Sequence, residues 1–411
     1  MSWTEMKILI ADKFERVGVD GLKELGCAVV SLPDLTAEAL PVALKEHDPN
    51  VLIVRGTKVT GEALRSGTSL SLVIRAGAGI DSIDVNAASD LGVFVSNCPG
   101  KNSVAVAELV LGLVLACDRR IPDQVADLRA GRWNKAEYSR ARGLHGRTLG
   151  IVGLGQIGRE IASRAAAFGM HVAAWSRNLT LAEAERLYIR YCQTPLEVAR
   201  VSDVVSINVA ANAETRNLVS EEFLEAMKPG AYLINTSRGT VIDEPALLQA
   251  IRAKGLRVGL DVFQNEPPAP SGTFESAIAR APGVYGTHHI GASTEQAQVA
   301  IAHEVIRIVQ EYLQSGIVPN CVNRLARSSA SHILAVRHRN RPGVLADVFR
   351  ILADRAINVE EVENIIYHGA HATLARIHLD GRPDAAALEA IRTGNEHVIS
   401  VELTAIDGRG W

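Results

Sequence analysis

The feature that most constrains the fold is a glycine-rich stretch, TLGIVGLGQIG, at residues 148–158. An apolar run leads into three glycines with the spacing GxGxxG, and an amphipathic run follows them. The first glycine permits a tight turn, the second lets the backbone approach a pyrophosphate, and the third lets strand and helix pack closely. A strand, a glycine turn and a helix in this order predict a dinucleotide-binding unit. The residues expected to contact the cofactor here are Gly153, Gly155, Gln156, Ile157 and Gly158.

Short apolar runs alternate with helical patterns along most of the chain. A second block of alternation begins at the glycine motif, and a first block has apolar runs near residues 7–11, 27–31, 51–55, 72–75 and 93–96. Continuous apolar strands that alternate with helices are typical of parallel sheets covered on both faces. The sequence therefore predicts an α/β protein with two doubly wound, Rossmann-like domains.

A long amphipathic segment, residues 294–314, follows the second block. We expect it to return to the first block, so that residues 1–102 and 290–320 form one discontinuous domain around a nucleotide-binding domain at 103–289. A linker that contains Gly, Pro, Asn and Ser comes next. Residues 331–411 then show a βαββαβ rhythm, which predicts a separate, ferredoxin-like domain.

The composition excludes several classes of protein. The 411 residues carry a net charge of −3 at pH 7, so no basic excess points to nucleic acid or to an anionic membrane surface. The five cysteines are scattered and no pair has metal-ligand spacing, so we expect reduced thiols and no metal site. Neither a signal segment nor a bilayer-long apolar stretch is evident. A soluble, cytoplasmic protein is therefore expected.

The strand after the glycine motif ends without the acidic residue that usually holds the ribose hydroxyls of NAD. It reads HVAAW and continues into Ser176 and Arg177. A carboxylate at this point would repel a 2′-phosphate, whereas a hydroxyl and a guanidinium would accept one. The pair favours NADP over NAD, and a surface arginine beside bound NAD is the alternative interpretation.

Three segments at predicted strand ends carry residues suited to proton and hydride chemistry. They are INTSRG with Arg238, DVFQNEP with Glu266, and THHIGAST with His289. Oxidation of a hydroxyacid needs a group that takes the hydroxyl proton, and histidine suits this role because its pKa is near neutral. A neighbouring carboxylate orients the ring, and an arginine binds the substrate carboxylate and polarises the developing carbonyl. Each residue alone could be an ordinary surface group, but open α/β sheets bind ligands at strand ends.

At these segments the sequence resembles the D-isomer-specific 2-hydroxyacid dehydrogenase family, over residues 1–320. The resemblance implies that Arg238, Glu266 and His289 are a catalytic trio that works with NAD(P). The register of IGAST selects His289 rather than His288, which stands where the family usually has proline. The same segments hold two further residues expected to contact the cofactor, Thr236 and Asp261.

The resemblance also implies a substrate site in the first domain. The segments VRGTKVT and RAGAGID are similar to the family's substrate loops, and the glycines of the second can present backbone amides to a carboxylate. The alternative for the basic residues of the first loop is a solvated surface charge. The expected substrate contacts are Arg55, Lys58, Arg75, Gly77 and Asn102.

The C-terminal domain resembles an ACT domain, which senses amino acids. One such domain behind a dehydrogenase of this family implies conversion of 3-phosphoglycerate to 3-phosphohydroxypyruvate in L-serine biosynthesis. In serine-inhibited relatives the effector is held at positions that match His338, Asn340 and Asn358, although asparagine is also a common turn residue. Serine is therefore a possible effector. In relatives a segment that matches Arg132 and Trp133 reaches a neighbouring subunit, so we expect a homodimer or homotetramer.

Two other functions fit parts of this pattern. A glyoxylate or hydroxypyruvate reductase, or another D-2-hydroxyacid dehydrogenase, would keep the chemistry and change the substrate; Ser176 and Arg177 favour it because NADPH suits reduction. A nucleotide-sensing corepressor would keep the fold without catalysis. The intact trio and the lack of a basic excess argue against the corepressor.

Overall fold

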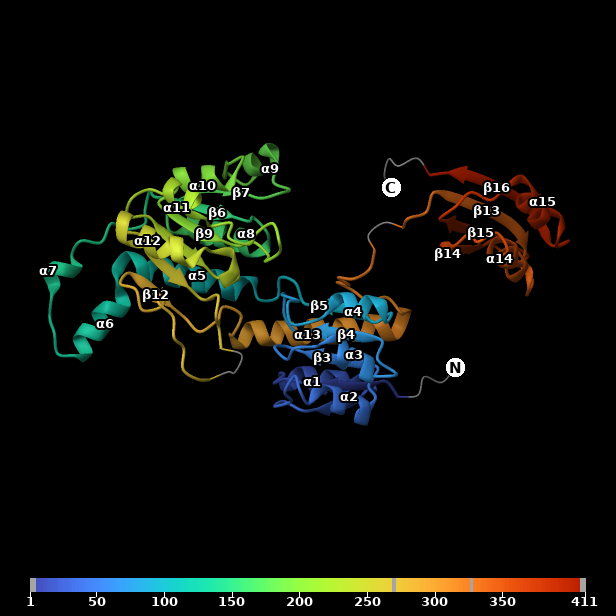
Figure 1. The fold of residues 1–411 in the computed structure, drawn as a ribbon, viewed down its shortest axis with the longest axis horizontal. Helices are drawn as coiled ribbons and strands as arrows, with labels where there is room; N and C mark the ends of the chain where they lie inside the picture. Colours follow the sequence, from blue (N-terminus) through green and yellow to red (C-terminus); the bar gives the residue numbers. More distant parts are fainter. Residues whose placement is uncertain (1–4, 268–270, 326–327, 407–411) are drawn as a thin grey trace. The chain divides into compact units, whose positions relative to one another are not determined.

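The structure is a computed structural model that describes residues 5–267, 271–325 and 328–406. Its contacts divide the chain into two compact units, residues 1–323 and 324–411 (Figure 1). The first unit contains two parallel sheets and the second contains one antiparallel sheet.

The first sheet forms the N-terminal lobe of the first unit. Its strands are parallel in the order β2-β1-β3-β4-β5, which is the flavodoxin-like form of the doubly wound fold. Leu52 and Ile53 of the central strand are buried because helices cover both faces. The elements are β1 (Lys7–Ile10), α1 (Arg16–Glu24), β2 (Ala28–Ser31), α2 (Leu40–His47), β3 (Val51–Val54), α3 (Gly61–Ser66), β4 (Leu72–Arg75), α4 (Val85–Asp90) and β5 (Phe94–Asn97).

The second sheet forms the nucleotide lobe and begins at the glycine motif. Its strand order, β12-β11-β10-β9-β6-β7-β8, is that of a Rossmann sheet, with the switch point beside β6. The strands are β6 (Thr148–Val152), β7 (His171–Trp175), β8 (Arg190–Tyr191), β9 (Val204–Ile207), β10 (Tyr232–Asn235), β11 (Arg257–Leu260) and β12 (Val284–Gly286). The helices are α6 (Ile121–Arg129), α7 (Lys135–Tyr138), α8 (Gln156–Ala167), α9 (Leu181–Arg186), α10 (Pro195–Val201), α11 (Glu221–Ala226), α12 (Glu244–Lys254) and the short 3-10 turn η1 (Gly239–Val241).

Two long helices lie where the chain passes between the lobes. Helix α5 (Ser103–Arg119) packs on α8 and on β10, β11 and β12 of the nucleotide lobe. Helix α13 (Glu295–Ser315) packs on α1 of the N-terminal lobe, and an added Cβ at Gly21 would lie 2.5 Å from Ile306. The chain thus returns to its first lobe after completing the second.

The C-terminal unit is a four-stranded antiparallel sheet in the order β14-β15-β13-β16. Alternation along β13 places Leu334, Val336 and His338 in the buried layer. The elements are β13 (His332–Arg339), α14 (Val344–Ala353), β14 (Val359–Ile366), β15 (Ala372–Leu379), α15 (Ala385–Thr393) and β16 (Val398–Ala405). This is the βαββαβ arrangement of a ferredoxin-like fold.

The predicted fold class is confirmed by these three sheets. The predicted domain boundaries stay predictions, although the first two sheets fall within them. The two-residue strand β8 was not expected, since a segment that short carries no alternation. In the described part of the chain, no group of three or more His, Cys, Asp or Glu is placed to hold a metal.

No helix among the described residues is long and apolar enough to cross a membrane.

Candidate active site

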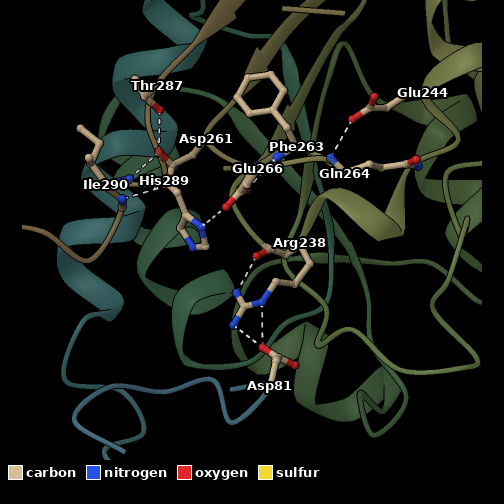
Figure 2. Close-up of polar contacts among 12 residues, drawn as sticks. Asp81, Arg238, Glu244, Asp261, Phe263, Gln264, Glu266, Thr287, His289 and Ile290 are labelled. Carbon is tan, nitrogen blue, oxygen red and sulfur yellow. Dashed lines mark hydrogen bonds and ion pairs between the residues drawn. The ribbon is translucent and has the colours of Figure 1, made fainter. Parts of the chain in front are cut away.

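Arg238, Glu266 and His289 come together although they lie on three separate segments (Figure 2). Arg238 follows β10, Glu266 follows β11 and His289 follows β12. These strands are neighbours in one parallel sheet, so their carboxyl ends meet at one edge, where open α/β sheets bind ligands.

Glu266 holds the ring of His289. Its Oε2 lies 2.7 Å from Nδ1 of His289, while its Oε1 accepts a 2.9 Å hydrogen bond from the backbone N–H of Phe263. Burial would raise the pKa of Glu266, but the hydrogen bonds from His289 and Phe263 and the charge of Arg238 together hold it below its usual value. The carboxylate stays ionised, and with Nδ1 donating to it, Nε2 of the ring is left as a base.

Asp261 fixes the loop that carries His289. The residue is 1% exposed. Its carboxylate accepts hydrogen bonds from Thr287 Oγ1 at 2.7 Å and from the N–H groups of Ile290 and Gly291 at 2.8 and 2.9 Å. Its carbonyl accepts from the N–H of His289 at 2.8 Å. His289 has a φ of +53°, a left-handed conformation that costs a non-glycine residue free energy, and these bonds maintain it.

Arg238 is held by partners on both lobes. The preceding turn is shaped by the buried Asn235, whose amide donates to the carbonyl of Arg238 at 2.9 Å. The guanidinium donates through Nε and Nη2 to one oxygen of Asp81 in the N-terminal lobe, at 2.9 and 2.7 Å (Figure 2). A Cβ at Gly79 would lie 2.1 Å from Nη2, so a side chain at this position would have to displace the guanidinium.

Arg75 and Arg55 add positive charge beside Arg238. Burial lowers the pKa of Arg75, and the charges of Arg238 and Arg55 lower it further, which places three guanidinium groups in one region. A Cβ at Gly77 would lie 1.5 Å from Nη1 of Arg75. Among the described residues, Nε of Arg75 has no hydrogen-bond partner although it is buried. An orphaned donor in a cationic cluster is suited to an anionic ligand.

Asp12 fixes the loop that carries Arg55. Asp12, just after β1, accepts hydrogen bonds on one oxygen from the N–H groups of Arg55, Gly56 and Thr57, at 2.6, 3.1 and 3.1 Å. The Arg55 guanidinium donates to Ser293 at 3.4 Å, four residues beyond His289. Lys58, on the same loop, is exposed.

The glycine motif has the geometry that a dinucleotide needs. A Cβ at Gly153 would lie 2.6 Å from the carbonyl of Asn208, and one at Gly158 would lie 2.4 Å from the carbonyl of Gly153, so both positions demand glycine. A Cβ at Gly155 would have no neighbour within 4 Å, which leaves open space at the N-terminus of α8. These residues fit a bound pyrophosphate.

The remaining predicted cofactor contacts surround this loop. Gln156 and Ile157 begin α8, and a Cβ at Gly100 would lie 1.8 Å from the Gln156 amide. Ser176 and Arg177 follow β7, and the partly buried Thr236 follows β10.

Asn102 stands at the N-cap position of α5, where the chain enters the nucleotide lobe, but its side chain makes no capping hydrogen bond. Its Oδ1 is buried, and within the described part of the chain it has no hydrogen-bond partner.

The three predicted effector positions differ in exposure. His338 is 3% exposed, its Nδ1 lies 2.7 Å from the carbonyl of Arg339, and its Nε2 lies 2.8 Å from Thr373 Oγ1. Asn340 and Asn358 are exposed. Only these two asparagines therefore present side chains to solvent.

Sequence reasoning missed three residues that shape this site: Asp12, Asp81 and Asn235. The positions of two of them in the sequence could have indicated a role in the site: Asp81 lies within the RAGAGID loop, and Asp12 comes shortly after a buried strand. Asn235 ends β10 within the INTSRG segment, and its partners are the nearby Ser237, through both its N–H and its hydroxyl, and the carbonyl of Arg238.

Comparisons with known proteins identify the families to which the domains are similar. Residues 111–291 match the D-isomer specific 2-hydroxyacid dehydrogenase, NAD binding domain, and residues 332–393 match the ACT domain. The chain is 36% identical over 320 residues to the D-3-phosphoglycerate dehydrogenase of Methanocaldococcus jannaschii, a match that covers 77% of this chain and 59% of that protein.

Two solved structures share the architecture of the first unit. The glyoxylate reductase from Paecilomyes thermophila is 30% identical, with a TM-score of 0.69, over 77% of this chain and 98% of its own. The NADPH-dependent glyoxylate/hydroxypyruvate reductase from Sinorhizobium meliloti, in complex with NADP and malonate, is 28% identical, with a TM-score of 0.67, over 79% of this chain and 100% of its own.

The chain belongs to the D-isomer-specific 2-hydroxyacid dehydrogenase family. Its C-terminal part carries an ACT domain. The chain spans 59% of the length of the archaeal relative.

Proposed function

We propose that this protein is a cytoplasmic, nicotinamide-dependent 2-hydroxyacid dehydrogenase whose substrate is 3-phosphoglycerate. The observation that carries the proposal is the His289–Glu266 pair at 2.7 Å, with Arg238 at the same sheet edge (Figure 2). This arrangement joins a general base, the carboxylate that orients it and an anion-binding group.

In the proposed reaction His289 Nε2 takes the proton of the substrate hydroxyl as the carbonyl forms. Glu266 keeps the ring oriented and stabilises the imidazolium that results. Arg238 binds the substrate carboxylate and polarises the developing carbonyl oxygen. A bound nicotinamide supplies the hydride acceptor, and the residues that would hold the cofactor include Gly153, Gly155, Gln156, Ile157, Gly158, Ser176, Arg177, Thr236 and Asp261.

The substrate assignment rests on charge. Arg55 and Arg75, together with Arg238, supply more positive charge than one carboxylate needs, and a phosphate would satisfy the unpaired Nε of Arg75. Lys58, Gly77 and Asn102 complete the proposed substrate site. The relative from Methanocaldococcus jannaschii is named for the same substrate.

A glyoxylate or hydroxypyruvate reductase is the second candidate. Ser176 and Arg177 favour this candidate, because they suit the 2′-phosphate of NADPH and NADPH suits reduction. The Sinorhizobium meliloti relative of that name is described in complex with NADP. Initial rates with 3-phosphoglycerate, glycerate, glyoxylate and hydroxypyruvate, each with NAD(H) and NADP(H), separate the two. Turnover of the non-phosphorylated acids without turnover of 3-phosphoglycerate would reject the phosphorylated substrate.

We also propose that the ACT domain binds an amino acid, with L-serine as the first compound to test. Asn340 and Asn358 are the proposed side-chain contacts, and His338 supports the strand from which Asn340 extends. A homodimer or homotetramer is the expected assembly. L-Serine should lower the initial rate in the wild type and not in Asn340→Ala, and equal rates with and without serine would remove this effector.

A further inference from the structure

Arg177, the residue that favours NADP, has an acidic partner in the same lobe. Its Nη1 lies 3.6 Å from Oε2 of Glu214, and the two side chains are 72% and 77% exposed. Arg177 follows β7 and Glu214 lies on the loop after β9. Strands β9 and β7 flank β6 in the sheet, so this ion pair spans the two sides of the glycine loop that follows β6.

The loop fixes Glu214 in this position. Asn212 Oδ1 accepts hydrogen bonds from the N–H groups of Glu214 and Thr215, both at 2.9 Å. The Thr215 hydroxyl donates to the carbonyl of Ala210 at 2.7 Å. The backbone of Glu214 is therefore held by an Asx-type turn, while its carboxylate is exposed and makes one ion pair, with Arg177.

We infer that Glu214 is a specificity-determining residue that weakens the preference for NADP. A 2′-phosphate that binds Arg177 must displace the Glu214 carboxylate and then meets its negative charge. NAD brings no such charge and leaves the ion pair intact. Arg177 and Glu214 thus act in opposite directions on the choice of cofactor, and this inference rests on the proposed dinucleotide site.

The test measures dissociation constants of NADH and NADPH by calorimetric titration of the full-length protein. Glu214→Gln should tighten NADPH by about fivefold relative to NADH, because the 2′-phosphate then neither displaces an exposed ion pair nor meets a like charge, both of which are weak effects at the surface. The gain should shrink in high salt, which screens exposed charges. In an Arg177→Gln background, Glu214→Gln should change the NADPH-to-NADH ratio less, because the pair is then already broken.

Glu275→Gln is the matched control, because Glu275 pairs with Arg280 at 2.9 Å with similar exposure and lies before β12, at the opposite edge of the sheet. It should leave the ratio unchanged. An unchanged ratio in Glu214→Gln, or the same change in Glu275→Gln, overturns the inference while leaving the proposed function standing. Failure of the wild type to bind either dinucleotide would instead overturn the proposed function and the inference with it.

Discussion

Removing Asp81 should slow turnover without weakening substrate binding. Asp81 is the residue of the N-terminal lobe that holds Arg238, through two hydrogen bonds at 2.9 and 2.7 Å. A hydrogen bond to a charged group contributes about 1.5–3 kcal/mol, and the exposure of 34% for Arg238 and 55% for Asp81 places this pair at the low end. A loss of about 1.4 kcal/mol in the transition state corresponds to a tenfold slower kcat.

The KM should not rise in Asp81→Ala, because the variant removes a negative charge from a region that binds anions. Steady-state rates over a range of 3-phosphoglycerate concentrations give the two constants separately. Asp90→Ala, an exposed acidic residue at the end of α4 in the same lobe, controls for the change in net charge. An unaltered kcat would refute the idea that Asp81 positions Arg238 for the chemical step.

Three further predictions test other parts of the molecule. Glu304→Gln should lower the free energy of unfolding by about 3 kcal/mol at pH 7, since hydrogen bonds, above all that from Arg307, lower the pKa of Glu304 from 4.5 to about 2. In urea titrations this difference should shrink as the pH falls through that interval, because the depressed pKa stabilises the fold only while the carboxylate is ionised. His289→Asn should reduce kcat by at least about 100-fold while thermal melting stays within a few degrees of the wild type. Gly77→Ala should raise KM, since the new Cβ would lie 1.5 Å from Nη1 of Arg75, and a wild-type KM would contradict this.

The sequence predicted the fold because the pattern for each element is local. Strands of the first two sheets read as continuous apolar runs, as expected where helices cover both faces of a parallel sheet. The proximity of Arg238, Glu266 and His289 was also predictable, since strand ends in one parallel sheet meet at one edge. Both inferences depend on periodicity and on short motifs.

The contacts that hold the trio were harder to predict because they cross long stretches of chain. Asp81 reaches Arg238 from the other lobe, 157 positions earlier. Asp12 accepts hydrogen bonds from backbone N–H groups near position 55. Every residue except proline has such a group, so the residue types on this loop do not indicate the contact. His338 is a different case: it was expected to contact an effector, but β13 extends through it to Arg339, and the alternation from Leu334 buries its side chain.

The proposed choice of substrate depends on the electrostatics of the N-terminal lobe more than on the trio. A base, a carboxylate and one arginine suit every 2-hydroxyacid, so they define a reaction and not a compound. Burial and neighbouring positive charges lower the pKa of Arg75. The free energy of its cationic form is therefore raised when no anion is bound. Asp81 offsets part of the charge of Arg238, and its charge counters the lowering of the Arg75 pKa only in part. A second anionic group on the substrate removes this cost on binding, whereas a small monoanion such as glyoxylate leaves it in place. The binding free energy of the phosphate is therefore the quantity that should separate 3-phosphoglycerate from its non-phosphorylated analogues.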